Sequence, residues 1–230
     1  MKDVIKKFYS ELRFPGTYGP EEMRFYQDHG VHNRYLVEID DLLIPGMSVL
    51  DVGCGSGMLT NLFATRYPDI HFTALDFSDS IDYGKSYASK NGNSNTTWIK
   101  IDFLQWSPPQ QYDLVICCGV LHHMPDWELA LSKLKLSVQP GGSLVLAVYN
   151  PWGKILKRLT KINYHCDILY HDQENNPFEI SFTDKQIRKE CSDLNFKKVI
   201  PSINNKFVDF GAIFNSANGG LALYVFTQPK

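Results

Sequence analysis

The sequence predicts an α/β protein built on a doubly wound sheet, that is, a mostly parallel sheet with helices on both faces. Three observations predict this class. Short apolar runs alternate with longer segments of helical periodicity, which is the pattern of parallel strands joined by crossover helices. The runs are rich in Val, Ile, Leu and Phe, as strands covered on both faces require. A glycine-rich turn follows the first run, at the edge where such sheets bind ligands.

Seven apolar runs are the expected strands. The first five alternate with helical segments, and the last two are separated by a stretch that is too long for a plain turn. The expected strands are 47–52, 71–75, 97–101, 114–118, 143–149, 196–200 and 221–227. We expect the last strand to run antiparallel to the others.

Four segments between these runs are the expected helices. Their ranges are 58–67, 81–90, 127–138 and 185–194. Ser78 and Asp79 supply an N-terminal cap for the second helix, because short polar side chains accept hydrogen bonds from its first amides. Gly92 suits the left-handed residue that ends that helix. Thr183 and Asp184 supply the cap of the last one.

Composition and charge limit the function classes. The chain has 230 residues and 26.3 kDa, with 43% apolar and 13% aromatic residues, enough for one globular domain with a core. Its formal charge of −2 lacks the basic excess of a dedicated nucleic-acid binder. No apolar run approaches the roughly 20 residues of a membrane span, and the first residues lack the apolar core of a leader peptide. We therefore expect a cytoplasmic protein without stable membrane insertion.

The cysteines predict neither a disulfide framework nor a metal site. They are odd in number and contain no Cys-x-x-Cys pair, which small disulfide-bonded proteins and zinc ribbons require. The five residues are Cys54, Cys117, Cys118, Cys166 and Cys191. We expect them to be reduced.

The glycine-rich turn carries the strongest functional signal. Gly53, Gly55 and Gly57 alternate between the first strand and a helix, and glycine there lets the backbone approach a ligand closely. Asp76 ends the second strand at the distance where nucleotide-binding sheets place a carboxylate for ribose hydroxyls. Asp102 ends the third strand. The alternatives are a turn without a ligand and strand-end carboxylates that are simply solvated.

Two other nucleotide cofactors fit the turn poorly. A dinucleotide fingerprint would place a third glycine at position 58, where this sequence has Met58. A phosphate-binding loop would end in Gly-Lys-Ser or Gly-Lys-Thr, which is absent. Without Lys or Arg in the turn, nothing there neutralises a triphosphate.

The motifs in this order resemble the class I S-adenosylmethionine-dependent methyltransferases. The resemblance is strongest to the branch with quinone-biosynthesis and other small-molecule enzymes, and it covers roughly residues 45–150. The residues that carry it are 51–57, Asp76, Asp102, 112–126 and 139–142. It implies a Rossmann-like fold, S-adenosylmethionine as methyl donor and S-adenosylhomocysteine as product.

The resemblance also implies a role for each motif. The three turn glycines would flank the methionine and ribose parts of the donor, and Asp76 would hold the ribose hydroxyls. Asp102 and Phe103 would contact the adenine, and Gly119 and Val120 would lie under the sulfonium. The expected cofactor-binding residues are Asp51, Gly53, Cys54, Gly55, Gly57, Asp76, Phe77, Asp102, Phe103, Gly119 and Val120.

The candidate catalytic residues are His122, His123 and Tyr18. Methyl transfer from a sulfonium is an in-line displacement, so the protein mainly aligns the reactants, and a base is needed only if the acceptor loses a proton. Imidazole accepts protons near neutral pH, and the alternative for both histidines is a packing role. We expect Tyr18 or Tyr35 to face the site from an N-terminal cap. The alternative is that these rings seal the sheet edge.

We expect one domain with four parts: a helical cap at 1–45, the cofactor-binding core at 46–149, an insertion or lid at 150–182, and the rest of the sheet at 183–230. The cap and the insertion are rich in aromatic residues, which favours a small-molecule acceptor methylated on O, N or C. The loop after the fourth strand lacks the Asn/Asp-Pro-Pro-Tyr/Phe motif of enzymes that methylate nucleic-acid bases, so a nucleic-acid partner is disfavoured.

Two other functions stay open at this point. One is a tRNA or protein methyltransferase, and the other is a catalytically idle scaffold that binds the cofactor. The basic stretch Lys154–Lys161 bears on the first. It is either a solvated helix face or a weak contact with a membrane surface or RNA. The sequence leaves the oligomeric state open.

Overall fold

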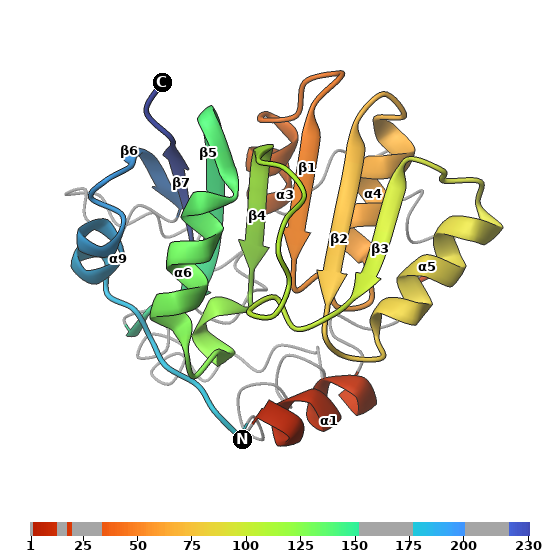
Figure 1. Ribbon diagram of the computed structural model, residues 1–230, viewed down its shortest axis with the longest axis horizontal. Coiled ribbons are helices and arrows are strands. Elements are labelled where there is room, and N and C mark those ends of the chain that lie inside the picture. Colours follow the sequence, from red (N-terminus) through yellow and green to blue (C-terminus); the bar gives the residue numbers. More distant parts are fainter. Residues whose placement is uncertain (1, 13–17, 20–33, 152–176, 201–220) are drawn as a thin grey trace.

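A seven-stranded sheet runs through the protein in the order β3-β2-β1-β4-β5-β7-β6 (Figure 1). The computed structural model describes residues 2–12, 18–19, 34–151, 177–200 and 221–230. The strands are β1 (Ser48–Val52), β2 (His71–Asp76), β3 (Thr96–Lys100), β4 (Tyr112–Cys118), β5 (Val138–Tyr149), β6 (Asn195–Ile200) and β7 (Leu221–Thr227).

Strand β7 is the antiparallel member of this sheet. The pairs β1·β2, β2·β3, β1·β4 and β4·β5 are all parallel, whereas β7 pairs antiparallel with both β5 and β6. Strand β7, the last strand in the described chain, therefore lies between β5 and β6 and runs antiparallel to both. The expected doubly wound sheet with an antiparallel last strand is confirmed.

Helices cover both faces of the sheet. The helices are α1 (Lys2–Leu12), α3 (Arg34–Asp40), α4 (Met58–Arg66), α5 (Ile81–Lys90), α6 (Trp127–Leu136) and α9 (Asp184–Glu190), with a single 3-10 turn, η1 (Leu121–His123). In Figure 1, α6 and α9 lie in front of the sheet and α3 and α4 behind it. Helix α1 lies below the carboxyl ends of the parallel strands, away from both faces.

The sheet separates two apolar cores. In β1, Leu50 faces the core that contains Leu134 of α6, and the preceding Val49 faces the core that contains Phe63 of α4. Successive side chains of a strand point to opposite faces. Because both faces are covered, the side chains that face either core are mostly apolar, which is why the sequence shows short apolar runs.

Most element boundaries agree with the sequence to within one residue, and β4 begins two residues early, at Tyr112. Strand β5 begins at Val138, five residues before the expected start, because Val138 pairs with Tyr112 at the beginning of β4. Helix α6 ends at Leu136, and α9 ends at Glu190 instead of continuing to residue 194. The cap at Thr183 is confirmed, since its hydroxyl accepts a hydrogen bond from the Gln186 amide at 3.2 Å. Gly92, which follows α5, has the expected positive φ of 75°.

Several sequence-based expectations lie outside the described residues. These are Cys166, Lys154–Lys161, much of the N-terminal cap and most of the insertion. Among the described residues, none of the helices has the length and apolar character to cross a membrane, and no group of His, Cys, Asp and Glu is arranged to hold a metal. The cytoplasmic location and the four-part division of the domain stay predictions.

Candidate functional site

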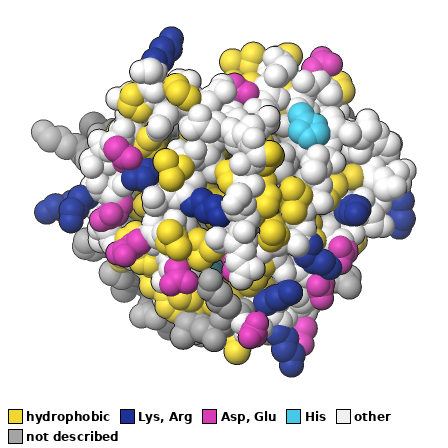
Figure 2. All heavy atoms as spheres, viewed as in Figure 1, with side chains coloured by type: hydrophobic (Ala, Val, Ile, Leu, Met, Phe, Trp, Pro, Cys, Tyr) yellow, Lys and Arg dark blue, Asp and Glu magenta, His cyan; other side chains and the backbone are white. Residues whose placement is uncertain are grey.

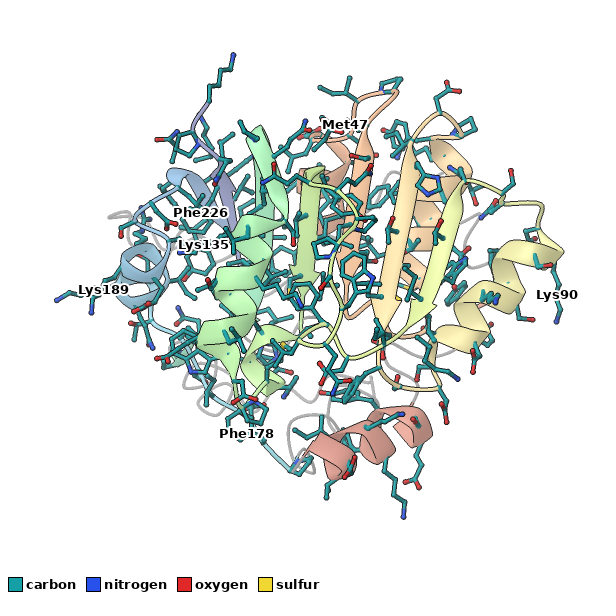
Figure 3. The ribbon with its side chains drawn as sticks, in the orientation of Figure 1. Met47, Lys90, Lys135, Phe178, Lys189 and Phe226 are labelled. Carbon is teal, nitrogen blue, oxygen red and sulfur yellow. The ribbon has the colours of Figure 1, made fainter. Side chains whose placement is uncertain are left out.

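A cleft opens between the carboxyl ends of the parallel strands and α1. It holds about 910 Å³ of empty space, part of which is open solvent. In Figure 3, Phe178 marks this end of the sheet and Met47 marks the opposite end. The lining residues are Ile5, Tyr9, Val52, Gly53, Gly55, Leu75, Asp76, Phe77, Ser78, Ser80, Ile101, Asp102, Phe103, Leu104, Cys118, Gly119, Val120, His123, Met124 and Pro125. Open α/β sheets bind their ligands at this edge.

The loop after β1 is tied to the neighbouring strand. The amides of Gly53 and Cys54 both donate to the carbonyl oxygen of Leu75, at 2.7 and 2.9 Å. Gly53 has a φ of 74°, and a Cβ added to it would lie 2.3 Å from a methyl carbon of Val120. Both the backbone angle and this close approach therefore exclude other residues at position 53.

Asp76 joins this loop to the end of β2. One of its carboxylate oxygens accepts a hydrogen bond from the amide of Gly55 at 2.8 Å. The other accepts from the amide and the hydroxyl of Ser78, at 2.8 and 2.7 Å. Burial raises the pKa of Asp76, and these hydrogen bonds partly oppose that shift. Asp76 also lines the cleft, so its carboxylate lies where it can meet a ligand hydroxyl.

Asp102 and Phe103 form the wall that follows β3. The Asp102 carboxylate accepts from the amide of Leu104 at 2.9 Å, which closes a tight turn. Lys133 of α6 supports this wall from behind, because its ammonium lies 5.3 Å from the centre of the Phe103 ring and donates to the Leu104 carbonyl at 3.1 Å. The Phe103 ring is therefore held between the cleft and a cation.

Gly119 and Val120 form the floor that follows β4. The amide of Gly119 donates to the Ala147 carbonyl at 2.9 Å, which fixes the turn against β5. Gly119 has a φ of 78°, and a Cβ added to it would meet no atom within 4 Å. Since Gly119 lines the cleft, that Cβ would occupy space that a ligand can use.

The two histidines of η1 have different environments. His123 lines the cleft, and its Nδ1 lies 3.1 Å from the carbonyl oxygen of Phe178. His122 is fully buried outside the lining, with its ring 4.1 Å from the His123 ring and 4.0 Å from the Tyr149 ring. The structure therefore places His123, but not His122, at the cleft.

The charges in the cleft suit a cation better than a polyphosphate. Asp76 and Asp102 are its acidic lining residues, and the described lining contains no Lys or Arg. The carboxylates at two strand ends suit a ligand with ribose hydroxyls and a positive sulfonium. The open space at Gly119 and the glycine loop let such a ligand approach the backbone closely. The residues present therefore fit S-adenosylmethionine.

Comparison with known sequences supports the same interpretation. Residues 50–144 match a family described as a methyltransferase domain. This stretch of the chain is therefore similar in sequence to a methyltransferase domain. The ubiquinone biosynthesis O-methyltransferase of Klebsiella pneumoniae is 32% identical over 117 residues, which are 47% of this chain and 45% of that protein. The probable (S)-tetrahydroprotoberberine N-methyltransferase 2 of Papaver bracteatum is 36% identical over 90 residues, 39% of this chain and 25% of that protein.

This chain thus spans less than half the length of these curated relatives. Its fold, by contrast, matches a solved structure over almost the whole chain. That structure is the N-methyltransferase NodS from Bradyrhizobium japonicum WM9 in complex with S-adenosyl-L-homocysteine. The TM-score is 0.64 and the sequence identity 15%, over 98% of this chain and 99% of that one. At this identity the likeness establishes the fold of the methyltransferase domain.

Three expected cofactor-binding residues of this domain lie beside the cleft and do not line it. Gly57 is constrained by packing, because an added Cβ would lie 2.6 Å from the Trp98 ring. Cys54 packs with Ala74 and Ile81, and burial raises the pKa of its thiol well above the ordinary value. Asp51 is buried under the loop and accepts from the Thr60 hydroxyl at 2.6 Å. Burial raises the pKa of Asp51 to about 6, and the charge of Asp76 adds to that shift.

Tyr18 does not line the cleft, which corrects the expected catalytic position. Its hydroxyl donates to the Ser56 carbonyl at 3.0 Å and accepts from the Asn61 amide at 2.8 Å, so it lies behind the loop. Its ring packs against those of Tyr83 and Tyr87. Tyr35 likewise donates to the Leu221 carbonyl at the start of β7. Both tyrosines are buried in the apolar core that also contains Phe63 of α4.

The cleft is covered instead by α1, which lies within the expected cap at 1–45, through two residues that the sequence did not single out. Ile5 and Tyr9 line the cleft on the side facing the strand ends. The helix is held by two hydrogen bonds to the start of α5: the Ser80 hydroxyl donates to the Tyr9 carbonyl at 2.6 Å, and the Asp79 amide donates to the Ser10 hydroxyl at 3.0 Å. The available signal was the spacing of Ile5 and Tyr9, since residues four apart share one face of a helix.

Proposed function

We propose that this protein transfers a methyl group from S-adenosylmethionine to an O, N or C atom of a small-molecule acceptor, and releases S-adenosylhomocysteine. One observation carries the proposal. Asp76, at the end of β2, accepts a hydrogen bond from the Gly55 amide, and both residues line the cleft. The carboxylate and the glycine backbone are therefore held together where one ligand can contact both. When bound, the donor supplies an electrophilic methyl group on a sulfonium.

Different residues of the cleft would contact different parts of the donor. Asp76 would accept hydrogen bonds from the ribose hydroxyls, and Phe103 would pack against the adenine with Asp102 beside it. Gly53, Gly55, Gly119 and Val120 would supply close backbone contacts along the donor. Cys54, Gly57 and Asp51 would act from behind, by fixing the loop.

Several features favour a small-molecule acceptor. Helix α1 covers the cleft with the side chains of Ile5 and Tyr9, and the opposite wall contributes Met124 and Pro125. A covered, mostly apolar site of this kind suits a compact organic molecule. The relatives named above act on small molecules by their names, an O-methyltransferase of ubiquinone biosynthesis and an N-methyltransferase of a tetrahydroprotoberberine.

The alternative of an RNA or protein acceptor finds no support on the face shown in Figure 2. There, Lys and Arg side chains are interspersed with Asp and Glu, and no continuous basic patch forms among the described residues. A polyanionic acceptor would favour a surface of one sign.

Transfer of a radiolabelled methyl group tests the proposal. The protein is incubated with methyl-labelled S-adenosylmethionine and either the low-molecular-weight fraction or the RNA and protein fraction of a cell extract. We expect label in the small-molecule fraction. Label confined to RNA or protein would favour the macromolecular alternative, and binding of the donor without any transfer would favour the idle scaffold.

A further inference from the structure

His123 stands at the end of the cleft farthest from the adenine wall. Asp102 follows β3 and η1 follows β4, and β2 and β1 lie between them in the sheet. With about 4.8 Å between neighbouring strands, the two walls are roughly 14 Å apart. A donor lying along the strand ends with its adenine at Asp102 would therefore direct its methyl end toward His123.

The contact with Phe178 determines which nitrogen of His123 carries hydrogen. Nδ1 of His123 lies 3.1 Å from the Phe178 carbonyl oxygen. A carbonyl oxygen can only accept, so Nδ1 must be the donor. A neutral imidazole carries one hydrogen, and its lone pair then belongs to Nε2.

The Phe178 carbonyl is itself held in place. The Ile180 amide donates to the His122 carbonyl at 2.9 Å, and the Phe182 amide donates to the Tyr149 carbonyl at 2.8 Å. Residues 178–182 thus run hydrogen-bonded along η1 and the end of β5. Phe182 anchors this segment, because it is fully buried and its ring packs 5.0 Å from that of Trp127.

Aromatic rings surround the imidazole of His123. His122 packs at 4.1 Å, Tyr149 at 5.8 Å and Tyr9 of α1 at 5.7 Å between ring centres. Among the described residues, these three, Cys118 in the cleft wall and Glu179 next to Phe178 are titratable groups on the elements around His123. The ring is therefore fixed by packing and by the hydrogen bond to Phe178.

We propose that His123 is the general base of this enzyme, that the Phe178 carbonyl directs the proton to Nε2, and that the acceptor is a molecule with a hydroxyl group. This inference rests on the methyl transfer proposed above. A neutral hydroxyl must lose its proton when its oxygen is methylated, whereas a neutral amine attacks with its own lone pair. A base in a fixed tautomer at the methyl end therefore indicates O-methylation.

Proton transfer to His123 accompanies methyl transfer to the acceptor oxygen. Nε2 of His123 takes the hydroxyl proton while the acceptor oxygen forms a bond to the methyl carbon. The bond between that carbon and the sulfur breaks, and its electron pair stays on sulfur as a thioether. The positive charge passes from the sulfonium to the imidazolium, which then releases the proton to water.

The tautomer can be measured without any acceptor. Nitrogen-15 correlation spectra of the full-length protein labelled in histidine, recorded at pH 8.5, distinguish a ring nitrogen that carries hydrogen from one that does not, and His123→Asn identifies the His123 signals. We expect a protonated Nδ1 and an unprotonated Nε2 at His123. An unprotonated Nδ1 would overturn the proposal, even if the protein binds S-adenosylmethionine.

Turnover then tests the acceptor class with a matched pair of probes, catechol and ortho-phenylenediamine, which present hydroxyls or amines on the same ring. We expect methylation of catechol, and a 10²- to 10⁴-fold loss in kcat in His123→Asn, the range typical of a lost general base. Asn keeps an N–H close to the position of Nδ1, so the bond to Phe178 survives.

His71→Asn is the matched control, because His71 is an exposed histidine at the opposite end of β2. It should leave turnover unchanged. Faster methylation of the diamine, or a catechol rate that His123→Asn does not change, would overturn the proposal. Calorimetric binding of S-adenosylmethionine to each variant separates these outcomes from failure of the proposed function, which would instead abolish donor binding in the unsubstituted protein.

Discussion

Asp76 accepts a hydrogen bond from the backbone amide of Gly55 across 2.8 Å, and this single bond joins the end of β2 to the glycine loop after β1. The acid that would hold the ribose is therefore also a support for the loop that would approach the rest of the donor. Buried and bonded on both oxygens, it has one orientation before any ligand arrives. Such preorganisation lowers the entropic cost of binding.

Removing this carboxylate should weaken donor binding. We expect Asp76→Ala to reduce the affinity for S-adenosylmethionine by roughly 2–3 kcal/mol, the scale of charge-assisted hydrogen bonds. Calorimetric titration measures the change. Asp79→Ala is the control, since Asp79 is an exposed acid three residues away that pairs with Lys100. Equal affinities of the two variants would argue against the ribose assignment.

A methyl group added at Gly119 should block the cleft. Gly119 and Gly92 both have positive φ, and an added Cβ meets no atom within 4 Å at either position. We expect Gly119→Ala and Gly92→Ala to lose similar stability, about 1–2 kcal/mol of backbone strain. Only Gly119→Ala should lose affinity for the donor, because only Gly119 lines the cleft. Undiminished binding by Gly119→Ala would show that the donor does not pass over this residue.

Helix α1 should retain the ligand in the cleft. Ile5 is 3% exposed and Val4 is 58% exposed, although they are neighbours on the same helix. We expect Ile5→Asp to speed the dissociation of S-adenosylhomocysteine, because a charge facing the covered cleft favours undocking of the helix. Stopped-flow measurement of the dissociation rate checks this. Val4→Asp provides the comparison, and an equal effect of both substitutions would contradict a covering role of α1.

Asp51 should make the folded protein more stable as the pH falls. An acid in a salt bridge has the opposite effect, because its folded pKa is lowered. Its folded pKa is about 6, above the ordinary value of 3.8. Above pH 6 the folded state therefore carries a buried charge at a cost of about 3 kcal/mol. As the pH falls from 6 toward 4, the folded state binds a proton that the unfolded state does not, and the cost disappears.

We therefore expect urea unfolding of the unsubstituted protein to gain about 1 kcal/mol between pH 7 and pH 5, relative to the variant Asp51→Asn. Asn cannot ionise and can still accept from the Thr60 hydroxyl, so the difference between the two proteins isolates the Asp51 charge. A difference that does not change with pH would mean that Asp51 titrates normally.

The sequence predicted the sheet well because its strands are buried on both faces. Leu50 and Val49 must both be apolar when each faces a different core, and such runs are visible without a structure. The strand ends and the glycine loop follow from the same runs, which is why Asp76, Asp102 and Gly53 were placed correctly at the cleft.

The functions of individual side chains were less predictable, because they depend on residues distant in the chain. Ser78 was expected to cap α5, but its hydroxyl donates to Asp76, and Ser80 precedes the helix instead. Gly57 is small because Trp98 lies against it. Tyr18 and Tyr9 are both aromatic residues of the N-terminal segment, and only the packing of α1 across the strand ends shows which of them reaches the cleft.

The most direct test of the account is calorimetric titration of the purified protein with S-adenosylmethionine and S-adenosylhomocysteine, with NAD as the control ligand. We predict micromolar binding of the first two at one site and no binding of NAD, because the described lining of the cleft offers carboxylates and no cationic side chain for a pyrophosphate. Binding of NAD, or of none of the three, would contradict the assignment of this cleft to the methyl donor.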